Sequence, residues 1–211
     1  MQPSALVYAI IEIVGSAAPT PVALEGGWVR LEPLSRDHLD AMFSIGMDPD
    51  LWRWIPMRMT SRDDMAKYIE TAVAGQQRAE MLPFATIYRP TGEVVGSTRY
   101  GNIDVPNRRL EIGWTWVTKE FQRTAVNTEA KFLLLRHAFE VLHYNRVEFK
   151  TDALNQRSRN AILRLGAREE GMFRKHMITE SGRVRDTVYF SITDDEWPQV
   201  KLRLEGYLAR T

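Results

Sequence analysis

Cysteine is absent from this chain of 211 residues, and the absence limits its chemistry. Without a thiol the protein has no disulfide, no thiolate metal site and no cysteine nucleophile. Its histidines show no spacing typical of metal ligands, so each is better explained as a surface or partly buried residue: His38, His137, His143 and His176. The sequence therefore predicts a protein without a metal site.

A charge excess of either sign is also missing. The chain carries 28 basic and 27 acidic side chains, for a formal net charge of +1. Nothing in this balance indicates a nucleic-acid partner or an acidic tail. Long apolar runs are scarce as well, because Ala5–Val14 is short, contains Glu12 and has no preceding Lys or Arg. This segment fits neither a membrane span nor a secretory signal, so we expect a cytoplasmic protein without a membrane partner.

Turn-forming residues separate this segment from the rest of the chain: Pro19, Pro21, Gly26 and Gly27. They are typical of a linker. We therefore predict an N-terminal extension over residues 1–26, either loosely ordered or forming an added edge strand. Residues 27–211 have the size of one domain, and we expect them to fold as such.

A glycine-rich dinucleotide fingerprint is missing too. No Gly-x-Gly-x-x-Gly occurs, and the predicted elements do not alternate regularly, so a nicotinamide enzyme is disfavoured. The patterns instead predict a strand, two helices, three strands, a helix, a strand, a helix, two strands and a final helix. This order predicts a mixed α+β fold around one central sheet.

The most informative stretch combines a strand over residues 109–117, a polar turn over 122–127 and a long helix that Asn127 or Thr128 could cap. Strand alternation places two sets of side chains on opposite faces. One set contains the apolar residues Leu110, Ile112, Trp114 and Trp116. The other contains Glu111, Gly113, Thr115 and Val117.

The polar turn is a candidate anion site. A strand that leads directly into a helix N-terminus leaves backbone N–H groups free, and the helix dipole adds partial positive charge. Arg123 adds a full charge. These features suit a phosphate or pyrophosphate, although a plain polar connection would explain the same residues.

Two motifs resemble a known family. The turn Gln122–Asn127 resembles the pyrophosphate loop of the GNAT N-acetyltransferases, Gln/Arg-x-x-Gly-x-Gly/Ala. The segment Asn155–Gly166 is similar to the Asn-x-x-Ser-x-x-Ala…Leu-Gly helix of the RimJ/RimL-type branch. The order of elements agrees from about Trp28 to Leu204. One departure is Ala125, which replaces the first glycine of the loop and is expected to crowd it against the phosphates.

The resemblance implies a mostly antiparallel, twisted sheet flanked by helices, with a splayed strand pair forming an acyl-CoA cleft. It also implies direct acetyl transfer from acetyl-CoA to a primary amine, on a protein N-terminus or a small molecule, without a covalent enzyme intermediate. The Val117 N–H would be the oxyanion donor. The residues expected to bind the cofactor are Trp116, Val117, Gln122, Arg123, Thr124, Ala125, Val126, Asn127, Asn155 and Ser158.

The catalytic acid and base are less directly indicated. The tyrosine acid of many GNAT enzymes is replaced by Ile162, so Ser158 is the candidate acid and Glu111 the candidate base. Each has a structural alternative: Ser158 could be a small packing residue, and Glu111 could form a surface salt bridge. Asn155 could be only a helix cap. Tyr100 or a water chain could replace these groups.

Three classes of function stay open at this point. The first is the acetyltransferase. The second is a catalytically silent acyl-CoA-binding or regulatory domain, favoured by Ala125 and the missing tyrosine. The third is a protein-interaction module that uses the tryptophans Trp52, Trp54, Trp114 and Trp116. The stretch Asp48–Met59 fits an acceptor-pocket wall and a loop pinned to the core equally well. A homodimer is also left open.

Overall fold

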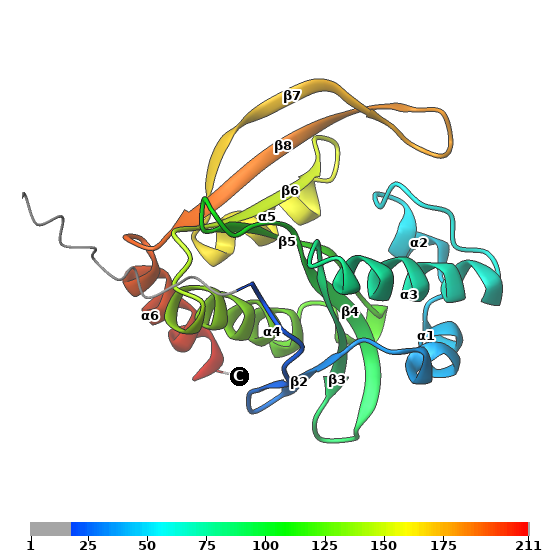
Figure 1. Cartoon of the computed structure of the whole chain (residues 1–211), viewed down its shortest axis with the longest axis horizontal. Helices are drawn as coiled ribbons and strands as arrows, with labels where there is room; N and C mark the ends of the chain where they lie inside the picture. Colours follow the sequence, from blue (N-terminus) through cyan, green and yellow to red (C-terminus); the bar gives the residue numbers. More distant parts are fainter. Residues whose placement is uncertain (1–17, 211) are drawn as a thin grey trace, which may run out of the picture.

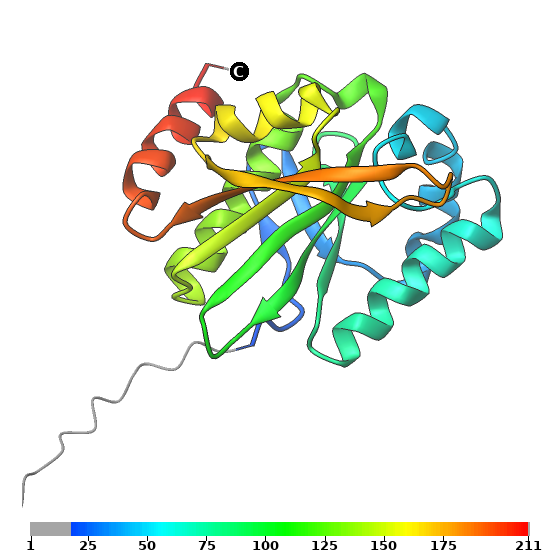
Figure 2. The same cartoon turned by 90° about the horizontal axis from the view of Figure 1, so that it is seen from above.

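The computed structural model describes residues 18–210. Their strands form one eight-stranded sheet in the order β1-β2-β3-β4-β5-β6-β8-β7 (Figures 1 and 2). Only β5 and β6 pair in parallel; every other neighbouring pair is antiparallel. The predicted mixed α+β fold with a mostly antiparallel sheet is confirmed. The strands are β1 Leu24–Glu25, β2 Val29–Pro33, β3 Leu82–Tyr88, β4 Glu93–Asp104, β5 Arg109–Val117, β6 Arg146–Asp152, β7 Arg168–Ile178 and β8 Val184–Thr193.

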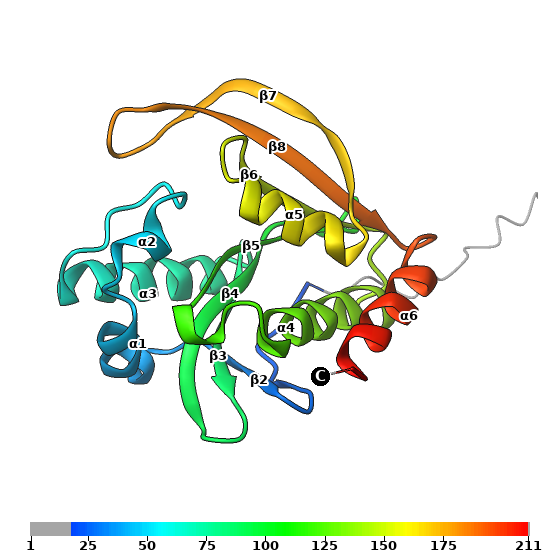
Figure 3. The ribbon, with the colours of Figure 1, turned by 180° about the vertical axis from the view of Figure 1, so that it is seen from behind.

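Helices cover both faces of the sheet and bury a hydrophobic cluster on each (Figures 1 and 3). The first cluster lies under α4, α5 and α6, and the second lies under α1, α2 and α3. The helices are α1 Leu39–Ile45, α2 Pro49–Trp52, α3 Arg62–Gln77, α4 Ala125–Arg136, α5 Gln156–Leu165 and α6 Trp197–Leu208. The short α2 falls in a stretch for which the sequence predicts no helix; Asp48 caps it and Pro49 occupies its first turn.

The N-terminal extension predicted over residues 1–26 is described only in part. Its apolar segment Ala5–Val14 lies outside the described residues. Its last residues include β1, which pairs with β2 at the edge of the sheet. Among the described residues, no helix combines the length and the hydropathy needed to cross a membrane.

The two strands β5 and β6 separate soon after they begin. They pair at Arg109 with Arg146, at Leu110 with Val147 and at Glu111 with Glu148, and no pairing follows. Beyond these pairs β5 continues to Val117 and β6 to Asp152. The predicted splayed strand pair is therefore present, and it leaves backbone polar groups of both strands without a ladder partner.

A β-bulge in β5 overturns the predicted division of its side chains. Gly113 pairs with Arg99 and Trp116 pairs with Ser97, so two residues of β5 face one residue of β4. The backbone of Trp114 lies in the left-handed region, with φ of 49°. Past this point the alternation is shifted by one residue, which exchanges the two faces.

The consequence is that the predicted apolar face is wrong. Leu110 and Ile112 belong to the cluster under α4, as does Val117, whereas Trp116 belongs to the cluster under α1–α3. Alternation alone cannot reveal a bulge, because the pattern contains only ordinary strand residues.

The start of α4 also differs from the prediction. The cap is Thr124, whose Oγ1 accepts a hydrogen bond from the Val126 N–H at 3.3 Å. Asn127 and Thr128, the predicted caps, lie inside the helix. Arg123 precedes the cap with φ of 64°, in the left-handed region that few residues other than glycine adopt. Ala125 is itself helical and needs no glycine conformation.

A buried carboxylate fixes α4 against the N-terminal part of the sheet. Glu129 accepts hydrogen bonds from the backbone N–H groups of Gly27, Trp28 and Val29, at 2.7, 2.7 and 2.6 Å. The adjoining Gly26 leaves room for this carboxylate, because a Cβ there would overlap it. The contact joins β2, at one side of the sheet, to the helix whose N-terminus borders the splay.

We expect Glu129→Gln to lower the free energy of unfolding by about 1–3 kcal/mol, because one amide group cannot accept all three N–H bonds and its NH₂ faces donors. Urea denaturation measures the change. Glu120→Gln, at an exposed position, is the matched control and should be nearly neutral. Equal stability of the two variants would show that the carboxylate does not fix α4.

Candidate active site

A cleft of about 660 Å³ opens where β5 and β6 part. One side is formed by α2 and the residues that follow it, the floor by the end of β5, and the other side by α4 and α5 (Figure 3). The residues lining it are Asp50, Leu51, Trp54, Ile55, Thr115, Trp116, Val117, Gln122, Arg123, Thr124, Ala125, Asn127, Thr128, Lys131, Asn155, Arg157, Ser158, Ala161, Ile162, Arg164, Leu165 and Tyr207.

Nearly all the predicted cofactor-binding residues meet at this cleft. The exception is Val126, which is buried in the cluster under α4 and does not line the cleft. The first turn of α4 directs N–H groups without helical partners toward the cleft mouth. Thr124 satisfies one of these, the N–H of Val126. The exposed Arg123 stands beside them.

The end of β5 presents backbone groups to the cleft. The side-chain amide of Gln122 donates to the Val117 carbonyl at 2.9 Å, and Arg157 of α5 donates to the Gln122 oxygen at 3.0 Å. The N–H and C=O of one strand residue point to the same side. The Val117 N–H therefore faces the cleft together with its carbonyl, where no strand pairs with it.

Two buried polar atoms of cleft-lining residues have no hydrogen-bond partner among residues 18–210. They are the indole Nε1 of Trp116, a donor, and the side-chain oxygen Oδ1 of Asn127, an acceptor. Such atoms are costly when unpaired, so buried polar groups normally have partners. The Asn127 oxygen fits a ligand that carries an amide N–H of its own.

The helix α5 positions the other predicted residues. Asn155 caps it, and its Oδ1 accepts a hydrogen bond from the Ser158 N–H at 3.1 Å, as predicted. Both residues line the cleft. The Ser158 hydroxyl is half-buried and, within the described part of the chain, hydrogen-bonds to no protein group.

Glu111 and Tyr100 are not part of this arrangement. Glu111 is 2% exposed, pairs with the Lys150 ammonium at 2.9 Å and accepts a bond from Asn102 at 2.6 Å. The predicted separation of Glu111 from the tryptophan face is wrong, since Lys150 contacts both Glu111 and the Trp114 ring. The geometry fits the salt-bridge interpretation, with the pair buried rather than on the surface.

The Tyr100 side chain is buried in the core. Its hydroxyl donates to the Leu134 carbonyl at 2.6 Å, and burial raises its pKa well above the ordinary value. It is therefore a poor proton donor for chemistry in the cleft.

Sequence reasoning missed the cations on the α4–α5 side of the cleft, Lys131, Arg157 and Arg164. Lys131 follows Asn127 by four residues, which places both on one helix face. This spacing from a predicted cofactor-binding residue could have placed Lys131 at the cleft from the sequence alone. Arg164 reaches across from α5 to the Thr128 hydroxyl and stacks on Tyr207. With Arg123 these residues make this side strongly positive, whereas Asp50 on the α2 side is the one carboxylate among the described residues of the lining.

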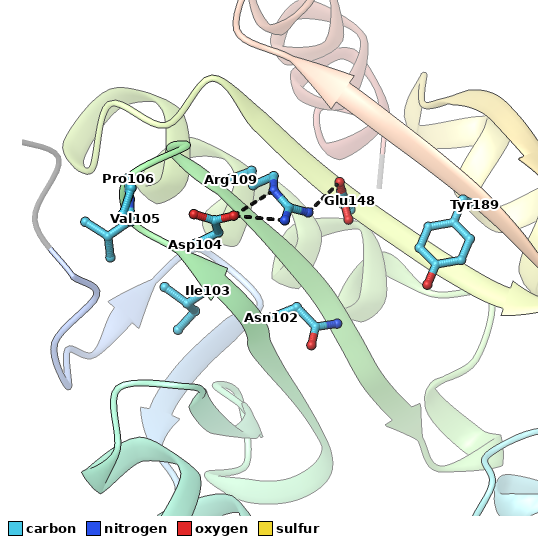
Figure 4. Close-up of a pocket in the computed structure, with 8 residues that line it drawn as sticks. All are labelled: Asn102, Ile103, Asp104, Val105, Pro106, Arg109, Glu148 and Tyr189. Carbon is cyan, nitrogen blue, oxygen red and sulfur yellow. Dashed lines mark hydrogen bonds and ion pairs between the residues drawn. The ribbon is translucent and has the colours of Figure 1, made fainter. Parts of the chain in front are cut away.

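A second hollow, of about 580 Å³, lies between the β4–β5 turn and β8 (Figure 4). Its lining carries two carboxylates and one guanidinium, and all three take part in ion pairs. Arg109 bonds to Asp104 at 2.9 Å and pairs with Glu148 at 3.5 Å. Because each charged group of its described lining already has a partner of opposite charge, the cleft at the splay is the better candidate site.

The comparison with family models identifies this arrangement. The model described as the acetyltransferase (GNAT) domain matches residues 29–168, so the chain belongs to the GNAT acetyltransferase family. This agrees with the two motifs and with the parted strands, and it confirms the family predicted from sequence. No group of three or more potential metal-binding His, Asp or Glu side chains occurs in the described residues.

Individual relatives support the same placement. A crystal structure of a GCN5-related N-acetyltransferase from Brucella melitensis is 34% identical, with a TM-score of 0.85, and covers 91% of this chain and 87% of its own. Mycobacterium smegmatis RimJ, solved in complex with CoA-disulfide, is 26% identical with a TM-score of 0.76 over 91% of this chain and 96% of its own. The RimJ/RimL-type resemblance is thereby confirmed.

A curated relative has a more specific name. The Bacillus subtilis (strain 168) protein called "Putative ribosomal N-acetyltransferase YdaF" is 37% identical over 106 residues. The match covers 50% of this chain and 57% of that protein. This chain therefore spans less than two thirds of that relative's length.

Proposed function

We propose that the protein uses acetyl-CoA to acetylate a primary amine directly, on a protein N-terminus or on a small molecule. The observation that carries the proposal is the polarity of the cleft. Cations and free helix N–H groups lie on the α4–α5 side, and a carboxylate lies on the α2 side. This polarity suits an anionic acyl-CoA entering from one side and a cationic amine entering from the other.

The loop before α4 would hold the pyrophosphate. Helix N-termini bind phosphates through free N–H groups and the helix dipole, and Arg123 adds a full charge. Ala125 lines the cleft in a helical conformation, so its backbone does not require glycine there. The expected crowding concerns the methyl group of Ala125, so this support of the silent-domain alternative remains.

The pantetheine arm would lie along the end of β5. Its amides would meet the cleft-facing N–H and C=O of Val117 in the manner of an added strand. The unpaired Asn127 Oδ1, on the cleft-lining Asn127, is a further acceptor of the right kind. Asn155 would approach from α5 while still capping it.

Acetyl transfer needs only a few groups of the protein. The amine nitrogen forms a bond to the acetyl carbon, the carbon–sulfur bond breaks, the sulfur takes up a proton and the amine gives one up. The Val117 N–H stabilises the carbonyl oxygen, and the Ser158 hydroxyl donates to the departing sulfur. Water takes the amine proton, because Glu111 is paired with Lys150 and Tyr100 is bonded to Leu134.

The two tryptophans of the α2 region have different roles: one pins the loop to the core, and the other belongs to the proposed acceptor-pocket wall. Trp52 is buried, donates to the Gly46 carbonyl at 2.6 Å and packs on Trp116, so it pins the loop to the core. Trp54 lines the cleft and would form the acceptor wall. Because Trp52 and Trp116 are buried, they are unavailable to a surface interface, which argues against the interaction module.

The test of the proposal is release of free thiol from acetyl-CoA with a panel of peptides and small amines. We expect Ser158→Ala to reduce turnover about tenfold or somewhat more and to leave acetyl-CoA affinity nearly unchanged, since solvent partly replaces the hydroxyl. Ser181→Ala, in an exposed turn, is the control. Unchanged turnover would make Ser158 a packing residue, and acetyl-CoA binding without thiol release from any amine would favour the silent domain.

A second prediction concerns Asp50. If this exposed carboxylate attracts the amine, Asp50→Asn should raise the KM for a cationic acceptor about two- to fivefold, as expected for an exposed ion pair. The effect should shrink at high salt, and the affinity for acetyl-CoA should not fall. Asp63→Asn, on the exposed side of α3, is the matched control. An identical KM for both variants would remove Asp50 from acceptor binding.

A further inference from the structure

Lys131 is a buried cation on the cleft wall without a carboxylate partner. Its side chain extends from α4 toward the sheet, and the residue is 6% exposed. Its ammonium donates to the hydroxyl of Thr98 on β4, at 3.1 Å, and to that of Thr115 on β5. The two hydroxyls lie 2.8 Å apart. None of the ion pairs among the described residues includes Lys131.

Other buried or partly buried cations of the described residues have carboxylate or aromatic neighbours that Lys131 lacks. Lys150 pairs with Glu111, and Arg185 lies 3.9 Å from Asp152. Arg99 has no carboxylate partner among residues 18–210, but its guanidinium lies over the Tyr68 and Trp114 rings, at 4.6 and 5.1 Å from their centroids. Arg99 does not line the cleft, whereas Lys131 does.

The pKa of Lys131 is unusual for a lysine with only a structural role. Burial lowers its pKa to about 7, because two neutral hydroxyls replace only part of the lost hydration. The other charged side chains of the cleft give no help: Arg123, Arg157 and Arg164 are cations, and Asp50 belongs to the α2 side. A buried charge is normally paired, so the missing anion is expected in a ligand.

The position of Lys131 along the cleft indicates which part of the ligand supplies this anion. At 1.5 Å per residue, Lys131 lies about 6 Å deeper along α4 than Asn127 of the first turn, where the pyrophosphate would bind. Its ammonium is tied to Thr115, in the bulge of β5 and next to Trp116. The bulge turns the Thr115 hydroxyl to the α4 side, two residues before Val117, whose N–H is the proposed oxyanion donor.

We propose that Lys131 is the counter-ion for the sulfur of CoA, an inference that rests on the proposed function. When the carbon–sulfur bond breaks, its electron pair stays on sulfur. The ammonium stabilises that negative charge while CoA is bound, and the sulfur takes up its proton when CoA leaves the cleft. With product CoA, the thiol proton moves to neutral Lys131 and leaves a thiolate–ammonium pair in the cleft. The Ser158 hydroxyl donates a hydrogen bond to the same sulfur.

The experiment measures thiolate absorbance in the ultraviolet when CoA is added to the protein at pH 7. A free thiol with pKa near 8.5 is only a few per cent ionised there. An adjacent cation should raise the bound thiolate fraction about tenfold. Lys131→Met should abolish the increase, Lys131→Arg should keep it, and the exposed Lys119→Met should leave it unchanged. Desulfo-CoA gives the baseline.

Each outcome separates this inference from the proposed function. If CoA binds to the wild-type protein but its thiolate fraction stays that of free CoA, Lys131 is not the counter-ion, and the proposed function stands. Lys131 is likewise excluded as the counter-ion if Lys131→Met binds CoA with an unchanged thiolate signal. If the wild-type protein binds neither CoA nor acetyl-CoA, both proposals fail. Lys131→Gln provides a second neutral variant should the methionine variant not fold.

Discussion

The early separation of β5 and β6 is the constraint on which the site depends. Two parallel strands that part after three residue pairs expose backbone N–H and C=O groups that the fold must satisfy in another way. Gln122 does so in part, since its amide binds the Val117 carbonyl and its oxygen accepts from Arg157 of α5. A ligand with amide groups can take over this function of the missing strand, which is why the gap serves as a binding cleft.

The rest of the structure keeps that gap open with defined walls. Glu129 fixes α4 by accepting three backbone N–H bonds from the start of the sheet, so the helix N-terminus stays at the mouth of the cleft. The bulge at Trp114 divides the end of β5 between two cores, because Trp116 packs against Trp52 while Val117 packs under α4. The resulting cleft is positive on one side and carries Asp50 on the other.

Sequence patterns predicted the architecture well and the details of the site less well. Alternation, helical spacing and the two motifs located the sheet, the loop before α4 and the capping residue Asn155, because each depends on local chemistry. The bulge at Trp114 could not be predicted, since ordinary strand residues occupy it. The burial of Glu111 with Lys150 and of Lys131 with two threonines depends on contacts between distant elements. A one-dimensional pattern does not record such contacts.

The central claim is that the splay between β5 and β6 binds acyl-CoA with its pyrophosphate at the start of α4. A crystal structure of the complex with CoA tests it most directly. We predict pyrophosphate oxygens within hydrogen-bond distance of the backbone N–H groups of residues 123–127, and pantetheine amides bonded to the backbone of Val117. CoA seated elsewhere, for example in the hollow beside Asp104 and Arg109, would contradict this account.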